Sequence, residues 1–107
     1  MIGVDITDLT RIRLDSSFVR HVLTEREMEE YAQRKSEKRK IEYVGGRFAA
    51  KEAIFKATGA ADFLAWSVLN GPDGKPYILN HPELEISISH DANLAIAAVK
   101  DAVSPAK

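Results

Sequence analysis

Apolar and polar residues alternate at the start of the chain. Residues 2–7 read IGVDIT, so every second position is Ile or Val and the positions between are Gly, Asp and Thr. This two-residue period is typical of a half-buried strand with one apolar face. We therefore expect a strand here, with Asp5 on the face opposite the apolar one.

Two helices should follow. Thr24 to Glu27 form a capping box, in which the Thr hydroxyl and the Glu carboxylate bind amides of the first helical turn. A helix should begin near Glu25 and end at about Arg34. The charged stretch RKSEKRK should be a break before a long helix over residues 40–57, which Gly59 would cap.

Glu52 occupies an unexpected position in the long helix. At 100° per residue it falls inside an apolar stripe formed by Ile41, Val44, Phe48 and Phe55. The carboxylate should therefore face the core or a cleft, where it needs a cation, a hydrogen-bonding partner or a metal. A core glutamate paired with a nearby lysine or arginine is the simpler alternative.

Beyond Gly59, short apolar runs alternate with turn residues. The runs AWSVLN, KPYIL, LEISIS and LAIAAVK predict an antiparallel meander, with Trp66 and Tyr77 in strands and His90 at a strand end beside a tight loop. The terminal SPAK should be a frayed tail. The pattern predicts an α+β fold, in which an N-terminal strand and helices accompany a long central helix packed on an antiparallel sheet.

Composition limits the protein further. With 107 residues, 45% of them hydrophobic, the chain suits a single domain over residues 1–107. It has no cysteine, which excludes disulfides and thiolate metal sites. We find no signal peptide and no membrane-spanning segment, so we expect a cytoplasmic protein with no membrane partner.

Positive charge is concentrated in the middle of the chain. Residues 34–56 hold eight Lys or Arg against three Glu, whereas both flanks are acidic. Such a zone suits phosphates or an acidic protein partner. A solvated helix face accounts for Lys35, Glu37 and Lys38, but less well for basic residues around Glu52.

Three side chains could carry chemistry. Asp5 and Glu52 could share one Mg²⁺ if the helix packs on the sheet, although a strand aspartate is more often a structural hydrogen-bond acceptor. His90 could act as a general base, donate to phosphate, or satisfy a loop carbonyl. Spacing alone does not separate these alternatives. The Gly74-Lys75-Pro76 segment has the form of a hairpin connection.

Four motifs together resemble one family. These are GVDI at residues 3–6, GRFAAKEAIFKATG at 46–59, GKPY at 74–77 and SISH at 87–90. They occur in the order found in holo-acyl-carrier-protein synthases, the small 4'-phosphopantetheinyl transferases. The resemblance implies a Mg²⁺-dependent transfer of phosphopantetheine from coenzyme A to a serine of apo-acyl carrier protein. Adenosine 3',5'-bisphosphate would be released, and the protein would be a homotrimer with active sites between subunits.

The resemblance also implies roles for individual residues. Asp5 and Glu52 match the metal ligands, and Glu52 and His90 match the catalytic positions. The positions that contact coenzyme A match Arg47, Lys56, Gly74, Lys75 and Pro76. Arg11 matches a position that grips the acidic carrier protein. The departures are a short connection at residues 60–65, an Asp after His90, and a carrier-docking segment that keeps only Phe18.

Two other functions compete with the transferase. An inactive relative could bind coenzyme A or carrier protein as a scaffold, which the short 60–65 connection would favour. A nucleic-acid-binding domain would rest on the basic zone alone, without the overall basicity or the exposed aromatic residues that such proteins use. We therefore expect no nucleic-acid partner.

Overall fold

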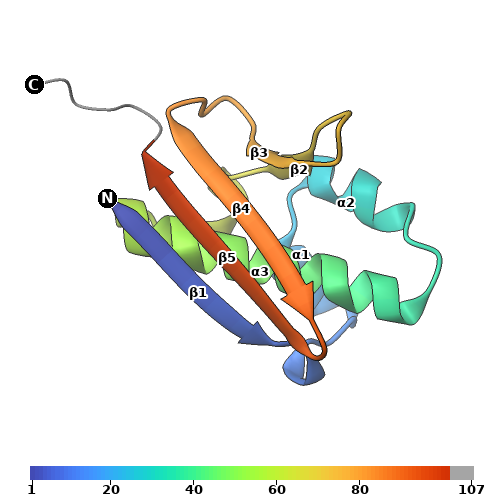
Figure 1. Cartoon of the computed structure of the whole chain (residues 1–107). Helices are drawn as coiled ribbons and strands as arrows, with labels where there is room; N and C mark the ends of the chain where they lie inside the picture. Colours follow the sequence, from blue (N-terminus) through green and yellow to red (C-terminus); the bar gives the residue numbers. More distant parts are fainter. Residues whose placement is uncertain (102–107) are drawn as a thin grey trace, which may run out of the picture.

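The computed structural model describes residues 1–101, and the SPAK segment at 104–107 lies outside them. Its elements are β1 (Ile2–Asp8), η1 (Leu9–Arg11), α1 (Ser16–Val22), α2 (Glu25–Ala32), α3 (Glu37–Thr58), η2 (Phe63–Ala65), β2 (Val68–Asn70), β3 (Pro76–Ile78), β4 (Leu84–Asp91) and β5 (Leu94–Asp101). Figure 1 shows the long helix α3 behind a three-stranded sheet. The predicted α+β class, with a central helix on an antiparallel sheet, is confirmed.

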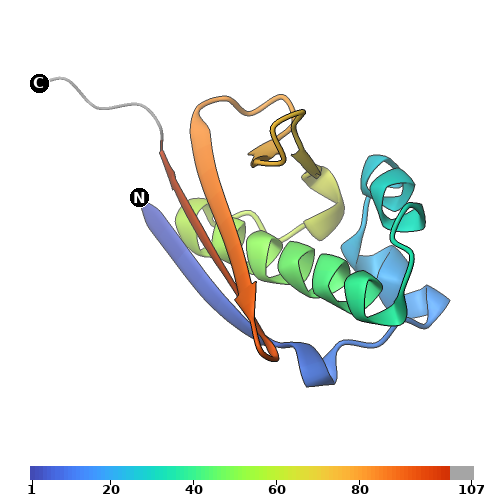
Figure 2. The ribbon, with the colours of Figure 1, turned by 45° about the vertical axis from the view of Figure 1, so that its right-hand side comes forward.

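The sheet has the strand order β1-β5-β4, with both pairs antiparallel. Figure 2 shows α3 between this sheet on one side and α1 and α2 on the other. The prediction of one continuous meander is wrong, because β2 and β3 form a separate two-stranded sheet. Both of these strands have only three residues, whereas β5 pairs along its whole length with β4 and over residues 94–100 with β1. Trp66 is not in a strand; it caps η2.

The helix boundaries follow the capping residues. The capping box of Thr24 and Glu27 is present at the start of α2, and Gly59 caps α3 with a φ of 83°. However, α3 begins at Glu37, earlier than predicted, because the Ser36 side chain accepts a hydrogen bond from the Arg39 amide. The charged stretch is therefore only partly a break, and its second half is helical.

Alanines form the buried face of α3. The core holds Ala49, Ala50, Ala53, Ile54 and Ala57 of this helix, packed against Ala97 and Val99 of β5. Small side chains let the helix approach the sheet closely. The predicted apolar stripe is only partly buried: Val44 is in the core, but Phe55 is 43% exposed.

The alternation in β1 was correctly predicted, but its apolar face is exposed. Asp5 and Thr7 point toward α3, whereas Ile2 and Ile6 are 70% and 58% exposed on the outer face of the sheet. Val4 belongs to the same exposed face of β1, and Leu94 and Ile96 extend this face onto β5. A patch of this kind marks an interaction surface.

A fully buried ion pair ties the helices together. Lys51 Nζ lies 2.7 Å from Glu27 Oε1 and also donates to the carbonyl oxygens of Val22 and Phe63. The second oxygen of Glu27 accepts from the Val68 amide at 2.7 Å. Burial lowers the pKa of Lys51, and the neighbouring Glu27 carboxylate partly offsets this shift. Lys51 is therefore a structural residue, although it precedes Glu52 in the chain.

Candidate active site

Asp5 and Glu52 line one cavity. It has a volume of about 490 Å³ and lies between β1, η1, α1 and α3. β1 and α3 are in close contact at Gly3, where a β-carbon would collide with the backbone carbonyl oxygen of Ala53. Glycine at this position therefore allows the strand to lie against the helix. As predicted, Glu52 faces a cleft and lies on the same side as Asp5.

The Asp5 carboxylate already contacts a cation. Lys56 Nζ donates to Asp5 Oδ1 at 3.2 Å and to the Val4 carbonyl oxygen at 3.0 Å. The hydroxyl of Thr7 donates to the other oxygen of Asp5 at 3.3 Å. The Asp5 side chain is mostly buried, whereas that of Lys56 is half exposed. Lys56, one helical turn after Glu52, therefore lies beside the first cavity.

The chemistry of this cavity fits a hard divalent cation. Two carboxylates provide oxygen ligands, and the ammonium of Lys56 shows that a positive charge is accommodated at Asp5. Residues 1–101 contain no cluster of three or more Asp, Glu, His or Cys residues that could hold a metal. A site with one or two carboxylates suits Mg²⁺, which keeps several positions for water and substrate phosphate.

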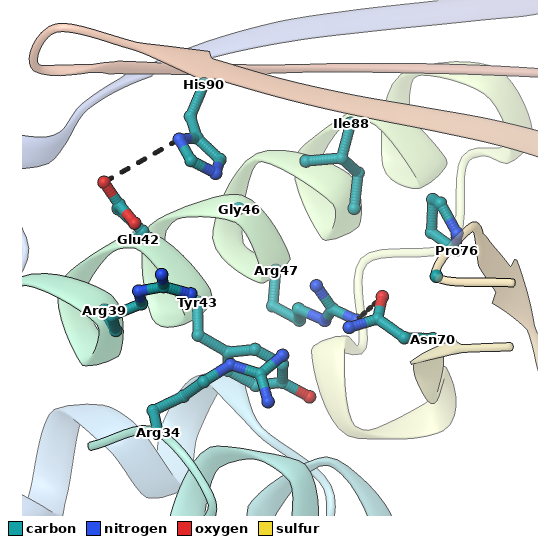
Figure 3. A pocket seen from close by; sticks show the side chains of 11 residues that line it. Arg34, Arg39, Glu42, Tyr43, Gly46, Arg47, Asn70, Pro76, Ile88 and His90 are labelled. Atoms are coloured by element: carbon teal, nitrogen blue, oxygen red, sulfur yellow. Dashed lines mark hydrogen bonds and ion pairs between the residues drawn. The ribbon is translucent and has the colours of Figure 1, made fainter. Parts of the chain in front are cut away.

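A second cavity, of about 250 Å³, is strongly basic. Arg34, Arg39 and Arg47 line it, together with Glu42, Tyr43, Gly46, Asn70, Gly74, Pro76, Ile88 and His90 (Figure 3). Arg47 Nε donates to the Val68 carbonyl oxygen and Nη2 donates to Asn70 Oδ1, each at 2.9 Å. Its guanidinium lies 4.2 Å from the centre of the Tyr43 ring. These contacts fix a buried positive charge at the cavity wall.

Tyr43 lines this basic cavity and contacts two of its arginines. Its hydroxyl donates to Glu30 Oε1 at 2.7 Å, and the guanidinium of Arg34 lies 4.6 Å from its ring centre. Burial, with the Glu30 carboxylate adding to it, raises the pKa of Tyr43 far above its usual range, although the Arg47 cation opposes this shift. The phenol therefore stays neutral and holds two arginines on one ring.

The residues matched to coenzyme A contacts divide between the cavities. Arg47, Gly74 and Pro76 line the basic cavity, whereas Lys56 lies beside Asp5. The side chain of Lys75 lines neither cavity. Gly74 has a φ of 84°, as the predicted turn between β2 and β3 requires.

His90 and Arg11 also belong to different cavities. His90 is near the end of β4, as predicted, and its Nδ1 lies 3.8 Å from Glu42 Oε2 in the basic cavity. Arg11, at the end of η1, is exposed and lines the cavity of Asp5 and Glu52. Because β1 and β4 are the two edges of the sheet, β5 separates the two cavities.

Sequence reasoning missed several residues of the basic cavity. Arg39, Glu42, Tyr43 and Gly46 lie three or four positions apart on α3, a spacing that places them on neighbouring turns of one face. That signal was available. The contribution of Asn70 depends on how β2 packs against α2 and α3, which no local pattern reveals.

No helix within residues 1–101 has the length and apolar character that crossing a membrane would require.

Comparisons with known proteins identify the family of this chain. Residues 1–99 match the family model described as the 4'-phosphopantetheinyl transferase superfamily. A holo-acyl-carrier-protein synthase of Halalkalibacterium halodurans is 42% identical over 91% of this chain and 90% of the relative. A crystal structure of the Bacillus anthracis synthase in complex with CoA (3',5'-ADP) has a TM-score of 0.81 and 39% identity, covering 92% of this chain and 91% of that one. The Helicobacter pylori synthase, in complex with coenzyme A, has a TM-score of 0.78 and 30% identity, covering 95% and 100%.

Proposed function

Because the chain belongs to the 4'-phosphopantetheinyl transferase superfamily, we propose that Asp5, Glu52 and Lys56 form the reacting part of its active site. The enzyme transfers the 4'-phosphopantetheine group of coenzyme A to a serine of apo-acyl carrier protein and releases adenosine 3',5'-bisphosphate. The observation that carries this assignment is that Asp5 and Glu52 line one cavity, while the ammonium of Lys56 contacts Asp5 beside it.

The reaction breaks one bond of a pyrophosphate. The serine oxygen forms a bond to the phosphorus that carries the pantetheine arm, the bond from this phosphorus to the bridging oxygen breaks, and the serine loses its proton. Mg²⁺ held by Asp5 and Glu52 would neutralise charge on the pyrophosphate oxygens. Lys56 would bind the same phosphates through its ammonium once it leaves Asp5.

The basic cavity binds the remainder of coenzyme A. Arg47 presents a fixed charge there, and Gly74 and Pro76 line the same cavity. Lys75 follows Gly74 in the same exposed turn and would contact the ligand from outside the cavity. His90 faces the arginines from β4, where it would act on phosphate or accept the serine proton.

Active sites between subunits would account for the separation of the two cavities. The two cavities lie at opposite edges of the sheet. One coenzyme A molecule would contact both kinds of cavity most simply if one copy of the chain provided the first cavity and a second copy provided the basic cavity. The exposed apolar face formed by Ile2, Val4, Ile6, Leu94 and Ile96 provides a surface for such association. We propose a homotrimer on this basis.

The carrier protein would dock beside the first cavity. Arg11 is exposed at its rim, where a negatively charged carrier could bind without entering the site. Docking there would bring the attacking serine near Asp5 and Glu52.

Mixing two defective variants tests the function and the shared site together. Glu52→Ala removes a carboxylate of the first cavity, and Arg39→Glu reverses a charge in the basic one. If the site lies between subunits, co-expressing the two variants restores transfer, because some interfaces then combine two intact halves. Hybrids no more active than the separate variants would overturn the shared-site arrangement.

A further inference from the structure

Glu42 is a carboxylate in a cavity built from arginines. Arg34, Arg39 and Arg47 line this cavity, yet within residues 1–101 Glu42 forms its ion pair with His90 and with none of the three. Its side chain is only 19% exposed, so the carboxylate is held near the wall rather than in free solvent. A negative charge in a cavity lined by arginines weakens the binding of anions there, so this carboxylate calls for another role.

The fold brings Glu42 and His90 together. Gly46 lies under Ile88, where an added β-carbon would be 3.4 Å from the Ile88 side chain, so helix and strand are close at this point. Glu42 is one turn before Gly46, and His90 is two residues after Ile88. The step from Gly46 to Glu42 is about 6 Å along the helix, and the step from Ile88 to His90 is about 6.8 Å along the strand. Because the two steps are nearly equal, Glu42 lies opposite His90 as Gly46 lies opposite Ile88.

One ring nitrogen of His90 lies toward Glu42. Its Nδ1 is 3.8 Å from Glu42 Oε2, a distance for an ion pair or a water-bridged contact rather than a direct hydrogen bond. Figure 3 shows the second ring nitrogen on the side of the ring away from Glu42. A carboxylate beside Nδ1 favours the tautomer in which that nitrogen carries the hydrogen.

We propose that Glu42 is a positioning residue for His90: it keeps the hydrogen on Nδ1 and leaves Nε2 directed at the ligand in the basic cavity. Nε2 then accepts a proton when the ring is neutral and donates to phosphate when the ring is protonated. The charged groups that face the ring are the three arginines and Glu42, with Asp91 next to it in the chain. The role of Nε2 in transfer rests on the proposed function, whereas the tautomer does not.

The tautomer can be measured on the protein alone. Long-range ¹H–¹⁵N correlation spectra of the ¹⁵N-labelled protein distinguish the two ring nitrogens, and His90→Asn assigns the His90 signals. In the wild type we expect the form with hydrogen on Nδ1. Glu42→Ala should shift His90 to the form with hydrogen on Nε2, while Glu42→Gln, which retains an acceptor oxygen, should preserve the wild-type spectrum.

The other histidines provide internal controls. His21 Nδ1 lies 3.0 Å from the Ser17 carbonyl oxygen, and His81 Nδ1 lies 3.0 Å from Glu83, so their signals should not respond to Glu42. Unchanged signals at His21 and His81 also show that Glu42→Ala folds normally. A His90 tautomer that is the same in the wild type and in Glu42→Ala would overturn the proposal.

Kinetics then test whether the contact matters for transfer. Glu42→Ala should lower kcat/KM for coenzyme A by roughly tenfold, by analogy with the loss of an orienting partner at metal-bound histidines. Glu42→Gln should restore most of it. In a His90→Ala background, Glu42→Ala should cause no further loss of kcat/KM, because Glu42 acts through His90. An equal loss of kcat/KM in both backgrounds would contradict the proposal. A wild type that transfers no phosphopantetheine would instead contradict the proposed function.

Discussion

The ammonium of Lys56 lies 3.2 Å from Oδ1 of Asp5. The lysine therefore supplies at this carboxylate the kind of positive charge that a metal would bring. Metal and lysine would compete for Asp5, and a phosphate group would relieve the competition by drawing the ammonium away. This relationship links metal binding to coenzyme A binding at a single side chain.

Lys56→Met should separate the two effects. Without coenzyme A, Mn²⁺ used as a paramagnetic probe should bind about two- to fivefold more tightly, since a half-exposed ion pair is worth under about 1 kcal/mol. Coenzyme A should bind more weakly, by roughly 1–3 kcal/mol for a charge-assisted contact. Electron paramagnetic resonance measures the first and calorimetry the second. Lys56→Arg keeps the charge and should change Mn²⁺ binding little; unaltered Mn²⁺ binding in Lys56→Met would show that the lysine does not compete.

Carrier docking should depend on charge at Arg11. Arg11→Glu should raise the KM for acyl carrier protein and leave coenzyme A binding unchanged, and the wild-type association rate should fall with added salt. Steady-state kinetics at several ionic strengths provide the measurement. Arg26→Glu, an exposed reversal on α2, is the matched control. Normal carrier kinetics in Arg11→Glu would place the docking surface elsewhere.

Tyr43 should make the protein less stable at high pH. Its pKa is raised in the folded state, mainly by burial, so the folded protein holds this proton above about pH 10, where an unfolded tyrosine releases it. Its stabilising effect is complete below that pH and is lost as the pH rises further, at up to about 1.4 kcal/mol per pH unit. Urea unfolding across this range should show a shallower decline for Tyr43→Phe than for the wild type. Tyr77→Phe, at an exposed ring, should decline as the wild type does.

Removing one partner of the Lys51–Glu27 pair should lower the free energy of unfolding strongly. Both side chains are fully buried, so Lys51→Met leaves an uncompensated carboxylate and should cost about 3–5 kcal/mol of the free energy of unfolding. The double variant Lys51→Met with Glu27→Gln should lose less than the two single losses combined. Lys38→Met, on the exposed side of α3, should stay within about 0.5 kcal/mol of the wild type. Additive losses would contradict a coupled pair.

Local patterns predicted the elements better than their surroundings. The capping box at Thr24 and the cap at Gly59 were readable because each depends on a few neighbouring residues. The face of β1 that packs on α3 could not be predicted, because an alternating pattern does not show which face is buried. In the structure the apolar residues of β1 point away from α3. The long-range pairing of β1 with β5 also has no local signature.

The candidate site was predicted in the same uneven way. Glu52 was identified because a carboxylate in an apolar stripe requires a reason, and it does face a cavity with Asp5. Its stripe was misjudged, since alanines rather than Phe55 make the core contact. Glu42 was read only as part of a charged segment, because its significance comes from a strand nearly fifty residues later in the sequence.

The most direct measurement is the mass of the carrier protein after incubation with this enzyme. Apo-acyl carrier protein, coenzyme A and Mg²⁺ are combined, and intact-protein mass spectrometry follows the carrier. The wild type should add one phosphopantetheine group to the carrier and none to a carrier whose serine is replaced by alanine. Asp5→Ala and Glu52→Ala should fold normally but transfer at least a hundredfold more slowly, as expected when electrostatic stabilisation of the transition state is lost, whereas Glu29→Ala on the exposed face of α2 should remain active. An unmodified carrier with the wild type, or near-normal transfer by either carboxylate variant at limiting Mg²⁺, would contradict the account.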